Sequence, residues 1–331
     1  MAAEKTTETA AQLLARQADY LIATAARAPS VHNTQPWRFR IGGDAVELYA
    51  DLTRKLKVDP LGREMLISCG AALFGLRLAV RSLGYRPVTE LFPEPPSLRL
   101  LARVRLGQPA AMTDAERSIL LALPHRHTHR GPFEAEPLPA GLLPGLQHDA
   151  VAEGSALALT GPDRWNKLVS IAAPASRQLD HTPVMQAETR RWTRPAGQRA
   201  RDGVPASAFA GGGLPARYGR LPQRDFDLGR GIGLLAADGP PPPAAGLLLT
   251  TRDGRADWLR AGQALHRLLL HAASRWVFAS LYTQPLEAAE IRRLIKSRLV
   301  LPGWPQVLLQ FGVARTSGAT ARRPPGELID S

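Results

Sequence analysis

A ten-residue segment that occurs twice constrains the fold of this chain more than any other feature. Cys69–Leu78 and Ala261–Leu270 align without a gap, and both are apolar and rich in small residues. A helix with so little polar surface is expected to be buried. The repeat indicates a chain made of two similar halves, unless two unrelated buried helices match by chance. Five positions are identical: Gly70/Gly262, Ala72/Ala264, Leu73/Leu265, Leu76/Leu268 and Leu78/Leu270.

The sequence around the two copies repeats as well. A strand is predicted before each helix, at Val46–Ala50 and Gly246–Thr251, and another after each, at Leu98–Leu106 and Gln306–Val313. Each half is therefore expected to contain a strand, a loop, an apolar helix and a strand. The 331 residues, 44% of them hydrophobic, are enough for two lobes that share a core. The halves are predicted at 1–115 and 116–331.

The composition is that of a soluble cytoplasmic protein. The single cysteine, Cys69, excludes an internal disulfide and fits a reducing compartment. Met1–Ala11 lacks the apolar core of a signal peptide. The longest apolar stretch, Met65–Val80, is interrupted by Arg77 and is too short to span a bilayer. We therefore expect no membrane association.

The net charge of +13 comes almost entirely from arginine, since only five lysines are present. Together with 29 glycines and 29 prolines, this excess is typical of a GC-rich genome. The arginines are spread along the chain and are not interleaved with aromatic residues, as a groove for single-stranded nucleic acid requires. A small anionic ligand therefore explains the charge better than nucleic acid does.

Two segments differ from the lobes. Thr9–Arg27 has the spacing of an amphipathic helix, which Pro29 ends. Residues 195–239 are rich in glycine, proline and arginine and have no steady period. An unstructured stretch of this length is usually a lid, a binding loop or a disordered insertion. A lid and a disordered surface insertion are both compatible with this sequence.

The first candidate site is the segment Pro29–Trp37, directly after the N-terminal helix. Pro29 stops the helix and Pro36 requires extended backbone at Gln35. The loop between the prolines consists almost entirely of residues that donate or accept hydrogen bonds, which suits the edge of a planar heteroaromatic ligand. From these residues alone, an ordinary helix-to-strand turn with Trp37 in the core is the simpler interpretation.

The second candidate site is Pro124–Phe133. If this segment is extended, Arg126, Thr128 and Arg130 lie on one face, while three histidines alternate with them on the other. Two guanidinium groups and a hydroxyl make a good phosphate receptor. Histidines without an acidic residue or cysteine nearby are weak evidence for a metal site. Phosphate binding and a solvated basic strand remain the two main interpretations.

Four motifs together resemble the nitroreductase family. Pro29–Trp37 resembles its Pro-Ser-x-x-Asn-x-Gln-Pro-Trp motif, and Arg126–Arg130 resembles its Arg-x-Ser-x-Arg phosphate motif. Arg322-Arg323-Pro324 resembles the closing basic motif, and Tyr282–Glu287 the segment beside the isoalloxazine. The first two motifs stand in reversed order and far apart here. That order is similar to the fused, Acg-type branch, in which one chain holds two degenerate copies of the subunit.

The resemblance implies an α+β, nitroreductase-like fold duplicated within the chain, which forms an internal pseudo-dimer. The half at 1–115 would supply the Pro-Ser-x-x-Asn loop and the half at 116–331 the phosphate site, so that one FMN is bound per chain. The family motifs carry the FMN contacts over to Pro29, Ser30, Val31, His32, Asn33, Gln35, Arg126, Thr128, Arg130, Gln284, Pro285, Leu286, Arg322 and Arg323.

The function that follows is an oxidoreductase passing hydride from NAD(P)H through FMN to a small acceptor such as a nitroarene or quinone. No side chain is singled out as a general acid, and no metal is expected. The alternative is a catalytically silent protein that holds flavin beneath a lid at 195–239. The partners implied are small molecules only, with a monomeric pseudo-dimer. Val31 replaces a serine common in the family, which removes one hydrogen bond to the flavin.

Overall fold

The computed structural model describes residues 8–94, 99–131, 133–195, 197–208, 224, 226, 228, 244–314 and 320–330. Most of the predicted lid at 195–239 lies outside the described residues. The α-helices are α1 (Ala10–Arg16), α2 (Ala18–Ala26), α3 (Arg63–Ser82), α4 (Asp114–Leu121), α5 (Leu142–Ala152), α6 (Pro162–Asp180), α7 (Pro183–Trp192), α8 (Arg255–Ser274) and α9 (Ala289–Arg298). Short 3₁₀ helices are η1 (Val31–Asn33), η2 (Leu52–Arg54), η3 (Ala206–Ala208), η4 (Gln284–Leu286) and η5 (Pro325–Glu327).

The strands form two four-stranded antiparallel sheets and one two-stranded sheet. They are β1 (Trp37–Gly42), β2 (Ala45–Ala50), β3 (Tyr85–Leu91), β4 (Leu100–Pro109), β5 (Ala156–Leu159), β6 (Thr193–Arg194), β7 (Val204–Pro205), β8 (Ala244–Thr250), β9 (Val277–Leu281) and β10 (Trp304–Val313). Helices that pack on antiparallel sheets make this an α+β fold, as predicted.

The two large sheets have the same strand order. The first sheet has the order β1-β2-β4-β3, and the second has the order β5-β8-β10-β9. In both sheets the fourth strand along the chain lies between the second and the third. The register shifts in each sheet between the second and fourth strands. A long helix follows the second strand in both, α3 after β2 and α8 after β8. This repeated topology agrees with the repeat in the sequence. The predicted boundary at residue 115 falls inside α4.

The long helices cross where equivalent glycines meet. A Cβ on Gly70 would lie 2.1 Å from the carbonyl oxygen of Leu259, and a Cβ on Gly262 would lie 1.9 Å from that of Ile67. Leu259 stands to Gly262 as Ile67 stands to Gly70, so the contact is reciprocal, as at an interface with twofold symmetry. The glycines shared by the two sequence copies therefore mark the axis between the halves.

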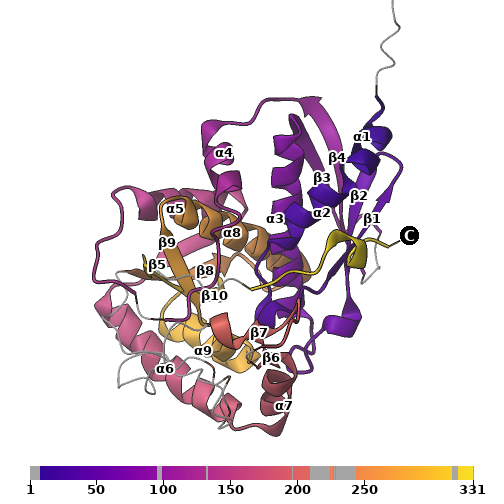
Figure 1. Cartoon of the computed structure of the whole chain (residues 1–331). Coiled ribbons are helices and arrows are strands. Elements are labelled where there is room, and N and C mark those ends of the chain that lie inside the picture. The colour runs from indigo at the N-terminus through magenta and orange to yellow at the C-terminus, as the bar shows by residue number, and fades with distance from the viewer. Residues whose placement is uncertain are drawn as a thin grey trace, which may run out of the picture.

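One apolar core joins both halves. Leu21 of α2, Leu73 of α3 and Leu268 of α8 belong to the same buried cluster. Figure 1 shows α3 and α8 at the centre, with α2 packed on α3 and α5 packed on α8. Cys69 is buried at this centre, and burial raises the pKa of its thiol, which fits a structural role.

Two predictions about local structure need correction. Thr9–Arg27 forms two helices, because Gln17 leaves helical geometry (φ −96°, ψ 8°) and redirects the chain so that α2 lies on α3. The apolar stretch at 65–80 belongs to the 20-residue α3, which is long and apolar enough to span a membrane. In the described chain 83% of its apolar window is buried, as in a core helix. Strand β3 escaped prediction because its side chains alternate between half-buried and exposed.

Two segments connect the halves. The segment at 126–130 is fixed on β9 of its own half, where Thr128 forms a parallel bridge with Ala279 and the His129 amide donates to the Ala279 carbonyl oxygen at 2.9 Å. It reaches the first half through Arg126, whose Nη2 donates to the Arg27 carbonyl oxygen at 3.3 Å. The C-terminal segment returns to the first half, where the Phe39 amide of β1 donates to the Leu328 carbonyl oxygen at 2.8 Å. Figure 1 shows this segment, in yellow, running from the second half to β1. These connections bring distant sequence motifs to one place.

Candidate functional site

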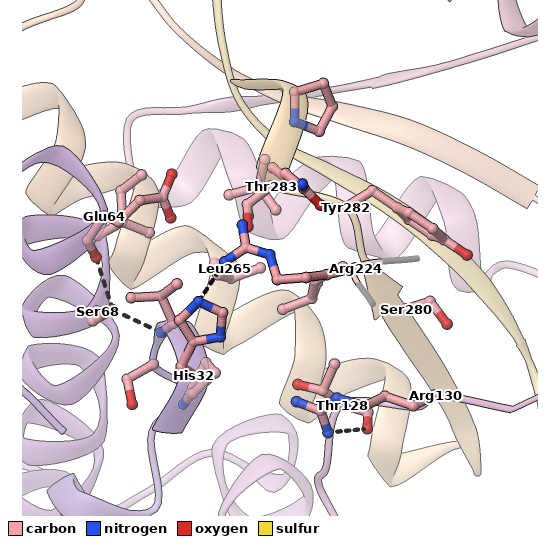
Figure 2. A pocket seen from close by; sticks show the side chains of 18 of the residues that line it. His32, Glu64, Ser68, Thr128, Arg130, Arg224, Leu265, Ser280, Tyr282 and Thr283 are labelled. Atoms are coloured by element: carbon pink, nitrogen blue, oxygen red, sulfur yellow. Dashed lines mark hydrogen bonds between the residues drawn. The ribbon is translucent and has the colours of Figure 1, made fainter. Parts of the chain in front are cut away.

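A pocket lies where the two halves meet. The first half contributes the loop after α2 and one face of α3, and the second contributes the end of β9 and the turn that follows it. Figure 2 shows His32 and Glu64 on the side of the first half and Thr283 and Arg130 on the side of the second. The lining residues are Pro29, Ser30, Val31, His32, Glu64, Ile67, Ser68, Thr128, His129, Arg130, Ser176, Arg224, Phe226, Leu265, Ser280, Leu281, Tyr282, Thr283, Gln284, Pro285 and Val307.

The loop after α2 is held in an uncommon backbone conformation. His32, Asn33 and Gln35 have positive φ angles of 48°, 54° and 50°. Non-glycine residues rarely adopt this region, and such strain persists only where surrounding bonds enforce it. Ser30 Oγ accepts a hydrogen bond from the Gln35 amide at 3.0 Å, and Ser68 Oγ accepts one from the Val31 amide at 3.3 Å. The loop is therefore a fixed wall of the pocket.

Asn33 and Gln35 do not line the pocket but join three segments. Asn33 Nδ2 donates to the carbonyl oxygens of Gly203 and Ala321, both at 3.1 Å. Gln35 Oε1 accepts a hydrogen bond from the Arg323 amide at 2.8 Å. These amides tie the loop to the C-terminal segment and to the start of the 195–239 region. Asn33 Oδ1 stays buried without a partner.

The segment at 126–130 alternates as its spacing predicts. The rings of His127 and Phe278 lie 4.4 Å apart between centroids, and those of His129 and Phe133 lie 4.7 Å apart. Burial lowers the pKa of His127 to about 4, so this side chain is neutral at pH 7. The described residues contain no cluster of histidine, cysteine or carboxylate side chains that could hold a metal ion. These histidines pack against apolar rings instead.

Two arginines from the second half meet at the C-terminal end of α2. Arg126 Nη2 donates to the Arg27 carbonyl oxygen at 3.3 Å, while its Nε and Nη1 are buried and have no partner in the part of the chain that the structure describes. Arg322 donates to the carbonyl oxygens of Ala26 at 2.9 Å and Ala28 at 3.2 Å. Cations are favourable at a helix C-terminus because of the helix dipole. That interaction leaves part of the Arg126 guanidinium unused.

Burial and mutual repulsion destabilise the charges of this arginine cluster. Burial, together with Arg130 and Arg27, lowers the pKa of Arg126 to about 10. Burial also lowers the pKa of Arg130 to about 10. The pKa of Arg322 falls because of burial and the nearby Arg126. Within the described chain, neither Arg126 nor Arg322 has a carboxylate partner. Buried charges require a counter-ion, and guanidinium groups match a phosphate well.

Arg323 belongs to a different group of side chains. Its Nη2 donates to the Glu327 carbonyl oxygen at 2.7 Å and its Nε to the Glu327 carboxylate at 3.3 Å. After burial, the cation that lowers its pKa most is Arg54. Of the two adjacent arginines near the C-terminus, only Arg322 is electrostatically coupled to Arg126.

The turn after β9 forms the opposite wall of the pocket. Tyr282 is anchored by its amide, which donates to the Leu308 carbonyl oxygen of β10 at 2.9 Å. Gln284 Nε2 donates to Asp180 Oδ1 at 2.6 Å, whereas Gln284 Oε1 is buried without a partner. Leu286 is fully buried among side chains of β8 and β10, so it supports the turn from beneath.

Arg224 and Phe226, both from the 195–239 region, reach into the pocket. Arg224 donates to His32 Nε2 and, at 2.5 Å, to Glu287 Oε1 (Figure 2 shows the first contact). The Phe226 ring meets the His32 ring edge-on at 5.5 Å between centroids. Burial, Arg224 and Arg130 hold the pKa of His32 well below its usual range. His32 is therefore neutral and accepts a hydrogen bond from a cation.

Comparison with known proteins identifies the family. No protein-family model matches the chain. A Mycobacterium tuberculosis protein named “Putative NAD(P)H nitroreductase” is 32% identical to it, over 94% of this chain and 90% of that protein. The chain belongs to the nitroreductase family. The “Putative NAD(P)H nitroreductase acg” of the same organism is 29% identical over 92% of each chain. A solved “putative nitroreductase” from Anabaena variabilis has a TM-score of 0.49 at 12% identity, over 94% of this chain and 90% of that chain.

The residues expected from the nitroreductase motifs fall into two groups. Those that line the pocket are Pro29, Ser30, Val31, His32, Thr128, Arg130, Gln284 and Pro285. Those that lie around it, as described above, are Asn33, Gln35, Arg126, Leu286, Arg322 and Arg323. The segment at 126–130 and the C-terminal segment thus bring the motifs of both halves of this nitroreductase-family chain together around one pocket.

Several pocket residues lie outside the nitroreductase motifs. Glu64, Ile67 and Ser68 come from the first turns of α3, and Arg224 and Phe226 come from the 195–239 region. The sequence does distinguish Glu64, because it is the single acidic residue of α3. Arg224 had none, because arginines are common in that region and only the fold selects this one.

Proposed function

We propose that this chain is an FMN-dependent oxidoreductase that passes hydride from NAD(P)H to a small acceptor of the nitroarene or quinone type. The observation that carries the proposal is the buried arginine cluster beside a pocket shared by both halves. Two guanidinium nitrogens of Arg126 have no hydrogen-bond partner among the described residues, and burial and other cations lower the pKa of this side chain. The phosphate of FMN is an anion of the required kind. Membership of the nitroreductase family supports the same cofactor.

The residues around the pocket fit the parts of FMN. Arg126, Thr128 and Arg130 would hold the phosphate, and Arg322 would add positive charge behind them. A charge-assisted hydrogen bond contributes roughly 1.5–3 kcal/mol, so two or three supply a large share of the roughly 8 kcal/mol of micromolar binding. Gln284 Oε1 is buried with no partner among the described residues, and it would accept a hydrogen bond from a ring N–H of the flavin.

The chain's own residues bind and orient the reactants. When bound, FMN supplies the hydride chemistry. The strained 29–35 loop and the buried turn after β9 provide two fixed walls, so that a planar substrate can be held in one orientation. Ile67, Leu265 and Val307 add apolar side chains to the lining of the pocket, and an apolar lining favours the removal of water when a ligand binds. Such a site suits a small aromatic acceptor rather than a polar one.

The direct test is the flavin content of the purified protein. We expect one FMN per chain, because the first half lacks the arginine segment and the second lacks the 29–35 loop. Anaerobic addition of NADPH should bleach the flavin, and a nitroarene or a quinone should restore its colour. Absence of flavin after reconstitution, or two equivalents per chain, would contradict the proposal. Light scattering should give a monomer, since the pseudo-dimer interface at α3 and α8 is internal.

A second candidate is a protein that holds flavin without turnover. The observation that favours it is the reach of Arg224 and Phe226 into the pocket, where both contact His32. In this case NADPH would fail to bleach the bound flavin. The double substitution Arg224→Ala and Phe226→Ala should then open the pocket and allow bleaching. If the flavin of the unmodified protein bleaches readily with NADPH, the silent alternative is excluded.

A further inference from the structure

A buried cluster of charges beside the pocket is not explained by cofactor binding. Asp59 precedes α3, Arg63 and Glu64 open it, and Glu287 follows η4. Arg224 lies against them from the 195–239 region. The side chains of Arg63, Glu64, Glu287 and Arg224 are only 3%, 5%, 4% and 7% exposed. Charges in such an environment interact strongly because water screens them little.

Three carboxyl groups in this cluster share two guanidinium groups. Burial raises the pKa of Asp59, and hydrogen bonds from the backbone amides of Arg63 at 2.8 Å and Met65 at 3.0 Å oppose this rise. Burial also raises the pKa of Glu287, and Arg224 opposes that rise because its Nη2 donates to Glu287 Oε1 at 2.5 Å. The remaining carboxyl group, Glu64, must share Arg63, which also donates to Gln306. Among the described residues of this cluster, the three carboxyl groups therefore outnumber the two guanidinium groups by one.

Among the described residues, the other charged groups near Glu64 do not supply the missing cation. Arg292 is paired with Asp253 at 3.1 Å. His32 is neutral, because burial and Arg224 lower its pKa. A buried carboxylate without compensation takes up a proton instead. Accordingly, the pKa of Glu64 is raised to about 7, because burial, Glu287 and Asp59 together outweigh the opposing effect of Arg63 and Arg224.

Glu64 is also the carboxyl group that lines the pocket. Its backbone carbonyl accepts a hydrogen bond from Ser68 Oγ at 2.7 Å, which fixes the first turn of α3. One carboxyl oxygen contacts Arg63, and the other has no hydrogen-bond partner among the described residues. Figure 2 shows Glu64 across the pocket from Tyr282 and Thr283. A proton on this group is therefore available to a molecule in the pocket.

We propose that Glu64 donates the proton that accompanies hydride transfer to the acceptor in this pocket. This role rests on the proposed function. For a nitroarene the balance is R–NO₂ + NAD(P)H + H⁺ → R–NO + NAD(P)⁺ + H₂O. NAD(P)H is oxidised by two electrons, one N–O bond of the nitro group breaks, and its oxygen leaves as water. The Glu64 carboxylate then takes a proton from solvent.

The test compares Glu64→Gln with Glu116→Gln. Glutamine keeps the shape of Glu64 but cannot give up a carboxyl proton. Glu116 lies on α4, and the Arg81 guanidinium lowers its pKa to about 2, so it carries no proton to donate. The reduced protein–flavin complex is reoxidised with a nitroarene or with ferricyanide, which accepts electrons without a proton. An infrared spectrum of the flavin-free protein reports protonated carboxyl groups independently of turnover.

With the nitroarene, Glu64→Gln should slow reoxidation by about 100-fold, the usual size of a general acid contribution. The rate of the unmodified protein should decline above a pH of about 7, and this decline should vanish in the variant. Ferricyanide rates should be unchanged, and Glu116→Gln should match the unmodified protein in both. Equal nitroarene rates in Glu64→Gln and the unmodified protein would overturn the role of Glu64.

The infrared measurement separates this proposal from the proposed function. A carboxylic acid band near neutral pH that disappears in Glu64→Gln supports a protonated Glu64 whether or not flavin is bound. If the unmodified protein shows that band but binds no flavin, the result would contradict the proposed function alone. An unchanged spectrum in Glu64→Gln would contradict the protonated state and with it this inference.

Discussion

The two halves of the molecule share a core but differ in their connections. Their sheets have the same strand order, and their long helices meet at Gly70 and Gly262 in a reciprocal contact. The first half places ten residues, 27–36, between α2 and β1. At the corresponding point of the second half, only residues 153–155 join α5 to β5. The second half instead has the arginine segment at 126–130 beside β9.

This difference explains how a symmetric core can produce a single asymmetric site. Close packing at the helix crossing tolerates no added atom, so both glycines must stay. Connections on the surface are under no such constraint and can be lost from one half. The pocket is complete only where the loop of one half meets the arginines of the other. The following predictions test this contrast between an equal core and unequal connections.

The largest effect is expected at the helix crossing. Gly70→Ala and Gly262→Ala should each lower the free energy of unfolding by at least about 3 kcal/mol, because each Cβ would clash with a backbone carbonyl. The gain in helix propensity, about 1 kcal/mol, is too small to compensate. In the control Gly145→Ala, the Cβ meets the movable His271 ring, so the loss should be smaller. Chemical denaturation measures the free energy of unfolding of all three variants. Unequal losses in Gly70→Ala and Gly262→Ala would contradict a symmetric contact between the two helices.

The next effect concerns the arginines found only in the second half. Arg126→Ala should weaken FMN binding by roughly 1.5–3 kcal/mol, which is about 10- to 150-fold, because a charge-assisted hydrogen bond is lost. The same substitution should raise the melting temperature of the flavin-free protein, since it removes a buried cation without a carboxylate partner. Arg81→Ala, which breaks the ion pair with Glu116, should leave FMN affinity unchanged. Fluorescence titration would contradict the prediction if both variants bound FMN alike.

A third effect depends on pH. His266 of α8 occupies the position of Phe74 in the repeat, and burial lowers its pKa to about 3. Because the unfolded side chain titrates near 6.5, the unfolded state binds the extra proton between these pH values. Stability is therefore lost as the pH falls below about 6.5, by up to roughly 1.4 kcal/mol per unit for this residue.

His266→Phe gives the second half the phenylalanine that the first half has at the equivalent position, Phe74. We expect a flatter dependence of the unfolding free energy on pH between about 6 and 4 than in the unmodified protein. Loss of the hydrogen bond from His266 Nδ1 to the Ala71 carbonyl oxygen, 2.7 Å long, should cost about 1 kcal/mol at neutral pH. The exposed His148 serves as the control, since His148→Ala should leave the slope unchanged. An unaltered slope in His266→Phe would show that His266 does not cause the dependence of the unfolding free energy on pH.

The smallest effect is expected in the loop of the first half. Val31→Ser restores the hydroxyl that the family commonly has at this position. The added hydrogen bond should strengthen FMN binding by about 1 kcal/mol, or roughly fivefold. The loop should keep its conformation, because the Val31 amide still donates to Ser68 Oγ. Weaker binding in Val31→Ser would show that the apolar side chain is itself needed at the flavin.

Much of this architecture can be predicted from the residues themselves. The small and apolar repeat at 69–78 and 261–270 predicts two buried helices, because no other environment suits such a surface. The alternation at 126–130 predicts two chemically different faces, and the histidine face does pack against aromatic rings. Pro29 and Pro36 bracket the loop because proline restricts its own backbone and that of the preceding residue.

Contacts between distant segments decided the rest. Asn33 and Gln35, which the motif predicts beside the flavin, bind backbone groups at 203 and 321–323, and no local pattern encodes these contacts. Arg322 rather than Arg323 joins the cluster because only the path of the C-terminal segment determines which side chain turns toward α2. The charge of Glu64 likewise depends on Glu287 and Arg224, which are far away in the chain. Local residue types determine which groups are available, whereas burial and through-space charge determine their protonation and their partners.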